Sequence, residues 1–239
     1  MTKINVLGIN IDLWSLAESV VLITESIAGG KKLRIVTANP ELIYKARKQK
    51  ELQDIINSAD LVLPDGIGVV WALKQLGCTA AERVTGIDLT EYLLQEGSRR
   101  GWRVFLLGAR PGVAEKAVAR QATKYPGLIF CCQHGFFPAE EEPSVLERIR
   151  RFAPDLLLVG LGAPRQEFFN AAHQGIAGAS IGVGGTIDVL AGEVKRAPAF
   201  FRRSNLEWFY RLVTQPSRIR RQAVLPLYVL KVLRQKYLK

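Results

Sequence analysis

The stretch Asp155-Leu-Leu-Leu-Val-Gly-Leu-Gly-Ala-Pro-Arg-Gln-Glu167 holds the two features that decide the fold. A short apolar run, Asp155–Gly160, ends in a glycine-rich turn. Pro164 then begins a pattern of helical spacing, which Gly175 ends. A run this short and almost uniformly apolar is typical of a parallel strand that helices cover on both faces.

Residues 1–194 repeat this alternation of short apolar runs and helical spacing. We expect six further strands at the runs Ile4–Ile9, Arg34–Thr37, Leu61–Leu63, Arg103–Gly108, Leu128–Cys132 and Ser180–Gly184. Asp12 is the expected cap of a first helix, which Gly29 and Gly30 end, and Asn39-Pro40-Glu41 has the cap, proline and acid of a second helix start. The alternation predicts an α/β fold with a mostly parallel sheet and helices on both faces.

The composition excludes several other classes of protein. The chain has 239 residues, 48% of them hydrophobic and 23% charged, a balance that suits a folded globular protein and not a disordered one. Three cysteines and two histidines are too few for a disulfide framework or a zinc cluster, and Cys131 and Cys132 are adjacent. This cysteine usage leads us to expect a reducing compartment, and Met1–Asn10 has the pattern of a strand and not of a signal peptide.

The excess positive charge of the chain lies in its C-terminal segment. Lys195–Lys239 contains twelve basic residues and one acidic residue, Glu207, whereas the preceding residues contain 21 of each sign. This segment therefore accounts for the whole net charge of +11. A neutral body with a basic tail favours a polyanionic partner, either nucleic acid or an anionic lipid surface.

Two helices are expected in this basic segment, Pro198–Val213 and Pro216–Tyr237, the second with a kink at Pro226. Its longest uncharged apolar stretch, Ala223–Leu230, is too short to cross a bilayer, which takes about 20 residues. The mixture of aromatic, leucine and basic residues suits a helix lying in the plane of the headgroups. A helix packed on the core with a solvated basic face fits the same pattern.

Chemistry is expected where the predicted strands end, because ligands of open parallel sheets bind at the carboxyl ends of the strands. Five loops follow strands there: Thr37–Asn39, Pro64–Gly66, Gly108–Gly112, Gly160–Glu167 and Gly184–Asp188. Three are glycine-rich turns into helix N-termini, which favour a phosphate-bearing ligand. Such turns also occur in α/β proteins without that ligand, and none of the three is a G-x-G-x-x-G or P-loop motif.

Asp65 allows two interpretations, a turn residue of a Pro-Asp-Gly loop or a general base that takes a proton from a hydroxyl. Asp88 and Asp188 similarly suit plain helix starts, and Arg83 suits a surface ion pair with Glu82. The sequence has no Asp-x-Asp motif and no His, Asp and Glu cluster at metal-ligand spacing. A leaving diphosphate would therefore be met by Arg, Lys and backbone N–H groups, and we expect no metal.

A set of sequence blocks resembles the WecG/TagA/CpsF family of bacterial glycosyltransferases. The blocks are TANPE (37–41), ADLVLPDGIG (59–68), ERVTG (82–86), FLLGA (105–109), VGLGAPRQE (159–167), GVGGTID (182–188), RAP (196–198) and LEWFYRL (206–212). They span nearly the whole chain in the order of the family, which makes a chance match improbable.

The resemblance implies an inverting transferase that moves a sugar, typically N-acetylmannosamine, from a UDP-sugar to an acceptor such as undecaprenyl-diphosphate N-acetylglucosamine, without a metal or other cofactor. It implies a Rossmann-like catalytic core, residues 1–194, and a basic amphipathic appendage, residues 195–239, that closes the site and touches the anionic membrane. The expected location is the cytoplasmic face of the cell membrane, in teichoic acid, common antigen or exopolysaccharide synthesis. The resemblance leaves open whether the chain forms a homo-oligomer through surfaces that the tail otherwise covers.

The resemblance also assigns roles to individual residues. Asp65 corresponds to the proposed catalytic base of the family. The residues implied to contact substrate are Thr37, Asn39, Arg83 and Gln166. Those implied to lie near the nucleotide are Gly108, Gly184, Gly185, Thr186 and Asp188. The residues implied to bind the diphosphate from the appendage are Arg211, Arg218 and Arg221.

Three alternatives remain at this point. In the first, the chain catalyses the same kind of transfer, but the donor is UDP-glucose, UDP-galactose or a UDP-linked mannosaminuronic acid. A nucleic-acid-binding module with a basic arm fits the charge, although the many Leu, Val and aromatic residues of the tail argue against it. A dinucleotide-dependent dehydrogenase needs a fingerprint that Gly108-Ala-Arg-Pro-Gly112 matches poorly.

Overall fold

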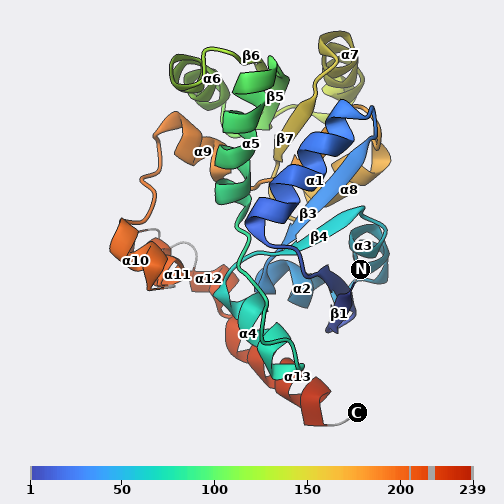
Figure 1. Cartoon of the computed structure of the whole chain (residues 1–239), viewed down its shortest axis with the longest axis vertical. Coiled ribbons are helices and arrows are strands. Elements are labelled where there is room, and N and C mark those ends of the chain that lie inside the picture. The colour runs from blue at the N-terminus through green and yellow to red at the C-terminus, as the bar shows by residue number, and fades with distance from the viewer. Residues whose placement is uncertain (1, 205, 215–218, 238–239) are drawn as a thin grey trace.

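A computed structural model describes residues 2–204, 206–214 and 219–237 (Figure 1). Its centre is a six-stranded sheet of order β4-β3-β8-β7-β5-β6, in which every neighbouring pair is parallel. The strands are β3 (Leu33–Ala38), β4 (Leu61–Pro64), β5 (Arg103–Gly108), β6 (Ile129–Gln133), β7 (Leu156–Gly160) and β8 (Ala179–Gly182). Each coincides with an expected strand to within a few residues, and the predicted α/β class is confirmed.

Helices cover both faces of this sheet because alternate residues of each strand face opposite sides. Ile35 and Leu106 belong to one buried cluster, whereas their neighbours Val36 and Leu107 belong to clusters on the other face. The helices of the first face are α1 (Leu16–Ala28), α5 (Gly86–Arg100), α6 (Val113–Lys124) and α9 (Thr186–Ala191). Those of the second are α2 (Pro40–Ala46), α3 (Lys50–Asn57), α4 (Ile67–Gln75), α7 (Glu142–Phe152) and α8 (Arg165–Ala172). A 3-10 turn, η1 (Ala139–Glu141), precedes α7.

The N-terminus forms a hairpin and not the single strand expected over Ile4–Ile9. β1 (Lys3–Val6) pairs antiparallel with β2 (Ile9–Asp12) in a separate two-stranded sheet. The chain reverses at Leu7 and Gly8, which have φ values of 53° and 95°. Glycine reaches such positive φ values without steric cost, so the prediction missed a turn that Gly8 makes possible.

The helix cap assigned to Asp12 is also wrong. Asp12 ends β2 with 2% of its surface exposed, and its carboxylate accepts a hydrogen bond from the Val62 N–H of β4 at 2.8 Å. Ser15 caps α1 instead, in a reciprocal capping box with Glu18. Asp12 thus joins the hairpin to the edge of the main sheet.

The described residues of the basic segment form four helices where two were expected: α10 (Ala199–Arg203), α11 (Glu207–Thr214), α12 (Ile219–Gln222) and α13 (Leu225–Tyr237). Pro226 lies in the first turn of α13 and not at a kink, a position where a missing N–H costs no intrahelical bond. In the described part of the chain, no helix is long and apolar enough to span a membrane.

α13 packs against α2 and α4 at one end of the molecule (Figure 1). Its Tyr228 and Val232 are 1% and 0% exposed and belong to the cluster that α2 and α4 share. Gln235 accepts a hydrogen bond from the Leu7 N–H and donates one to the Asn5 carbonyl, both at 2.8 Å. Gln235 therefore fixes α13 to the N-terminal hairpin. The division of the chain at residue 194 stays a prediction.

Candidate active site

The carboxyl ends of β3, β4 and β8 open into a cavity of about 410 Å³. Loops that follow these strands form one side of its wall, and α11 and α13 contribute Glu207, Trp208, Leu225, Tyr228 and Val229 to the other. The predicted site residues that line it are Thr37, Asn39, Asp65, Arg83, Gln166, Gly184, Gly185 and Thr186. The sheet thus gathers in one place residues that are up to 149 positions apart in the sequence.

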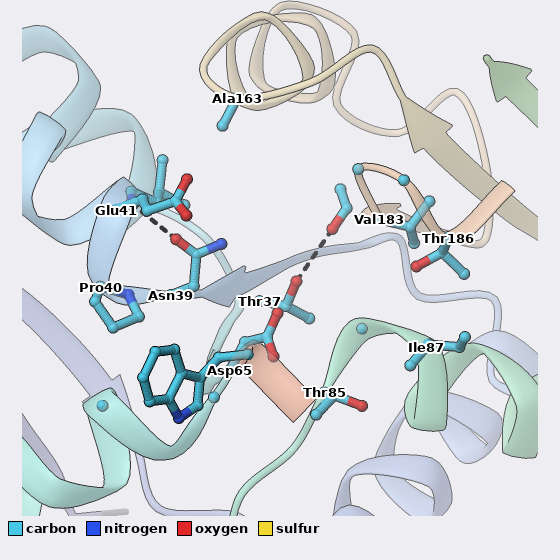
Figure 2. A pocket seen from close by; sticks show the side chains of 18 of the residues that line it. Thr37, Asn39, Pro40, Glu41, Asp65, Thr85, Ile87, Ala163, Val183 and Thr186 are labelled. Carbon is cyan, nitrogen blue, oxygen red and sulfur yellow. Dashed lines mark hydrogen bonds between the residues drawn. The ribbon is translucent and has the colours of Figure 1, made fainter. Parts of the chain in front are cut away.

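Asp65 and Asn39 are neighbours because β3 and β4 pair in parallel, with Ala38 opposite Pro64. The Asp65 N–H extends this ladder by one hydrogen bond to the Ala38 carbonyl, at 2.9 Å. Gly66, with φ +90°, then turns the chain into α4. Figure 2 shows the side chains of Thr37, Asn39 and Asp65 around the same opening.

The side chain of Asn39 caps α2, as the sequence predicts. Its Oδ1 accepts a hydrogen bond from the Leu42 N–H at 2.9 Å, and Pro40 occupies the first turn. This bond fixes the orientation of the amide and leaves its NH₂ group as the hydrogen-bond donor of the side chain. Thr37 lies two residues earlier, in β3. Its hydroxyl donates a hydrogen bond to the Gly182 carbonyl of β8 at 3.2 Å.

Arg83 lies in the cavity wall, 20% exposed, and does not pair with its neighbour Glu82. Its Nη1 lies 3.9 Å from Oε2 of Glu207 in α11, whereas Glu82 accepts a hydrogen bond from the Leu16 N–H. The alternative of a Glu82 and Arg83 surface pair is therefore wrong. Arg83 instead links the wall of the cavity to the one acidic residue of the basic segment.

The chain between α9 and α10 is anchored by Arg196, which bonds to Asp88 and, at 2.7 Å, to Glu91 of α5. Burial opposes the ionisation of Asp88, but hydrogen bonds from Thr85 and Arg196 and the charges of Arg196 and Arg83 outweigh it and lower the pKa of Asp88. Asp88 is thus more than a helix start, since it holds the base of the segment that leads to α11. The sequence offered Arg196 only as part of the RAP block.

Comparison with known proteins decides between the families that the fold allows. The model of the glycosyl transferase WecG/TagA/CpsF family matches residues 4–239. The chain belongs to this family. It is therefore a glycosyltransferase.

Two bacterial relatives carry the same name, N-acetylglucosaminyldiphosphoundecaprenol N-acetyl-beta-D-mannosaminyltransferase. The protein of Bacillus spizizenii is 40% identical over 203 residues, which cover 84% of this chain and 78% of the relative. The protein of Staphylococcus aureus is 36% identical over 238 residues, covering 98% and 93%. The match thus includes the C-terminal segment as well as the sheet.

Not every residue that the family resemblance singles out lies at the cavity. Gly108, at the end of β5, packs against Gly160 of β7, and Asp188 lies in the first turn of α9; neither is among the described residues of the wall. Arg218 lies outside the described residues, and so do the side chains of Arg211 and Arg221. Their roles stay predictions.

Gln166 lines the cavity, but both atoms of its carboxamide bond to the protein. Its Oε1 accepts a hydrogen bond from the Gly184 N–H at 3.0 Å, and its Nε2 donates to Oε1 of Glu167 at 2.8 Å. Sequence reasoning did not single out Glu167, which is 3% exposed. Burial raises the pKa of this glutamate, against the opposing effects of the Gln166 hydrogen bond and the charge of Lys45.

The raised pKa of Glu167 predicts a pH-dependent effect of Glu167→Gln on stability. As the pH rises above the ordinary glutamate pKa of about 4.3, the unfolded chain releases the Glu167 proton more readily than the folded protein does, so the wild type loses stability relative to the variant. We therefore expect the variant to be more stable than the wild type at pH 7 and to lose that advantage as the pH falls below about 4. Urea unfolding at both pH values measures it.

The matched control is Glu140→Gln, at an exposed glutamate of η1. Its free energy of unfolding should stay within about 0.5 kcal/mol of the wild type at pH 7. A Glu167→Gln variant that is less stable than the wild type at pH 7 would contradict the interpretation.

Proposed function

We propose that this chain transfers N-acetylmannosamine from a UDP-linked donor to N-acetylglucosamine carried on undecaprenyl diphosphate. The names of the relatives support the acceptor and the sugar, at 36–40% identity. The observation that carries the assignment is the position of Asp65, in the wall of one cavity with Arg83 and the loop Gly184–Thr186. A carboxylate, a cation and a glycine turn are what a hydroxyl acceptor and a diphosphate donor need.

The reaction is then a single in-line displacement with inversion. The carboxylate of Asp65 accepts the proton of the acceptor hydroxyl while that oxygen attacks the anomeric carbon of the donor sugar. The bond from this carbon to the UDP oxygen breaks, and UDP leaves from the opposite face with the bonding electrons. One glycosidic bond forms and one glycosyl phosphate bond breaks, and the proton stays on Asp65 until it passes to water.

Positive side chains and backbone N–H groups stabilise the negative charge that grows on UDP, in place of a divalent ion. Arg83 is the cation that the described cavity wall offers, and the backbone of Gly184 and Gly185 lies in the same wall. Arg211, Arg218 and Arg221 are the further cations that the family resemblance suggests. Among the described residues, no group of three or more His, Cys, Asp or Glu side chains is placed to hold a metal ion.

The basic segment is proposed to hold the enzyme on the anionic membrane surface that carries the acceptor, on its cytoplasmic side. α13 exposes Leu230 and Tyr237, 60% and 71% accessible, beside the cations Lys231 and Arg234. Exposed apolar groups next to cations favour the headgroup region of a bilayer. The opposite side of the same helix is packed on α2 and α4.

A donor panel tests the assignment of substrates. Purified protein is mixed with a lipid-diphosphate N-acetylglucosamine analogue and, in turn, UDP-N-acetylmannosamine, UDP-glucose, UDP-galactose and UDP-N-acetylmannosaminuronic acid, with and without EDTA. We expect mass spectrometry to detect one added N-acetylhexosamine from the first donor, at the same rate with the chelator. Transfer from another donor would show that the proposed donor is wrong. Loss of transfer in EDTA would show that the reaction needs a metal ion.

Asp65→Asn tests the catalytic base. The amide keeps the size of the side chain but cannot accept the proton, so kcat should fall by roughly 10²–10⁴ while the donor still binds. Asp54→Asn, at an exposed aspartate of α3, is the control and should leave kcat unchanged. A folded Asp65→Asn variant with near-wild-type kcat would remove Asp65 from this role.

Charge reversal on α13 tests membrane binding without removing the buried Tyr228 and Val232. Each basic residue near an anionic leaflet contributes about 1 kcal/mol, so Lys231→Glu with Arg234→Glu should weaken sedimentation with phosphatidylglycerol liposomes at least tenfold. Lys31→Glu with Lys32→Glu makes the same change in net charge ahead of β3 and should have a small effect. Equal losses in both variants would indicate attraction by net charge alone.

A further inference from the structure

Glu167 is a buried ionisable side chain that the proposed reaction leaves without a task. It lies in the first turn of α8 with 3% of its surface exposed, and it contributes to the cavity wall. Its Oε2 atom is buried and has no hydrogen-bond partner among the described residues. Burying a carboxyl group in this way costs stability, so the position calls for a compensating role.

The bonded oxygen of Glu167 determines which way the carboxamide of Gln166 points. Oε1 of Glu167 accepts a hydrogen bond from the NH₂ group of Gln166 at 2.8 Å, which places the amide nitrogen on the side of Glu167. The carbonyl oxygen of the same amide then faces the Gly184 N–H, at 3.0 Å. If the amide were flipped, its NH₂ group would face the Gly184 N–H. Both groups are donors, so the hydrogen bond between Gln166 and Gly184 would be lost.

Gly184 lies at the turn of the loop that connects β8 to α9, and the course of this loop depends on its backbone conformation. Its φ of +51° is one that side chains other than glycine adopt at a cost, and residues 182–186 all line the cavity. Gln166 also fills the space beside Gly182, where an added Cβ would come within 2.7 Å of its Nε2. The amide therefore contacts the loop at both ends of the turn.

We infer that Glu167 is a positioning residue for the loop 182–186: it orients Gln166, which holds Gly184 and so sets the shape of the cavity wall where the donor diphosphate binds. Gln166 then serves the site through the backbone of this loop. The part that concerns the diphosphate rests on the proposed function. The part that concerns the loop does not.

Amide hydrogen exchange at Gly184 tests the loop without any substrate. Glu167→Ala should speed exchange there roughly five- to tenfold, the loss expected for one hydrogen bond. Gln166→Glu should do the same, because it removes the NH₂ group that donates to Glu167. The exchanged pair, Gln166→Glu with Glu167→Gln, restores a donor facing an acceptor and should return exchange to within about threefold of the wild type.

Equilibrium binding of UDP by calorimetry, with KM and kcat for the donor, tests the consequence. The two single variants should weaken UDP binding and raise KM by about the same factor as the exchange, with kcat changed less, and the exchanged pair should recover both. Glu142→Gln removes a carboxylate that pairs with His173 at the other end of α8, and as the control it should change neither reading.

The outcomes separate the two claims. If Gly184 exchanges at the wild-type rate in folded Glu167→Ala, or if the exchanged pair restores nothing, the positioning role is wrong. Faster exchange with unchanged UDP affinity in a wild type that binds UDP would overturn the link to the diphosphate. A wild type that does not bind UDP would instead count against the proposed donor and leave the exchange result to decide the role of Glu167.

Discussion

The parallel pairing of β3 with β4 on one side and β8 on the other is the constraint on which the site depends. Parallel strands end at the same edge, so this pairing brings the loops at Asn39, Asp65 and Gly184 to one opening. The hydrogen bond from the Asp65 N–H to the Ala38 carbonyl continues the ladder of β3 and β4 into the loop, and the Thr37 hydroxyl donates a hydrogen bond across to Gly182 of β8. The proposed base is thereby held by the backbone of the sheet.

Most of the fold follows from patterns that are local in sequence. Short apolar runs predicted the six strands of the main sheet, and Asn39 was identified as a helix cap from its own neighbours. The predictions that were wrong concern residues whose structure depends on a contact or a backbone angle that the local sequence pattern does not show. The local sequence of Asp12 suits a helix cap, but its carboxylate bonds to the Val62 N–H of β4, 50 residues away. The reversal at Leu7 depends on the positive φ of Gly8, which the sequence pattern does not reveal.

The candidate site divides in the same way. Residues in strand-end loops were predictable, because the fold places them at one edge of the sheet. The contacts made by packing were not predictable: Glu207 and Arg196 reach Arg83 and Asp88 across more than 100 positions, and the buried Glu167 accepts a hydrogen bond from Gln166. Two signals pointed to Glu207: it is the single acidic residue among the twelve basic residues of the C-terminal segment, and it belongs to the LEWFYRL block.

The central claim is that the Asp65 carboxylate faces a sugar acceptor in a cavity that also holds UDP. A crystal structure with UDP and a soluble acceptor analogue tests it most directly. The account predicts an Asp65 carboxylate oxygen within about 3.2 Å of one acceptor hydroxyl, and the diphosphate against the loop at Gly184. UDP bound outside this cavity, or an Asp65 side chain turned into the protein away from the acceptor, would contradict it.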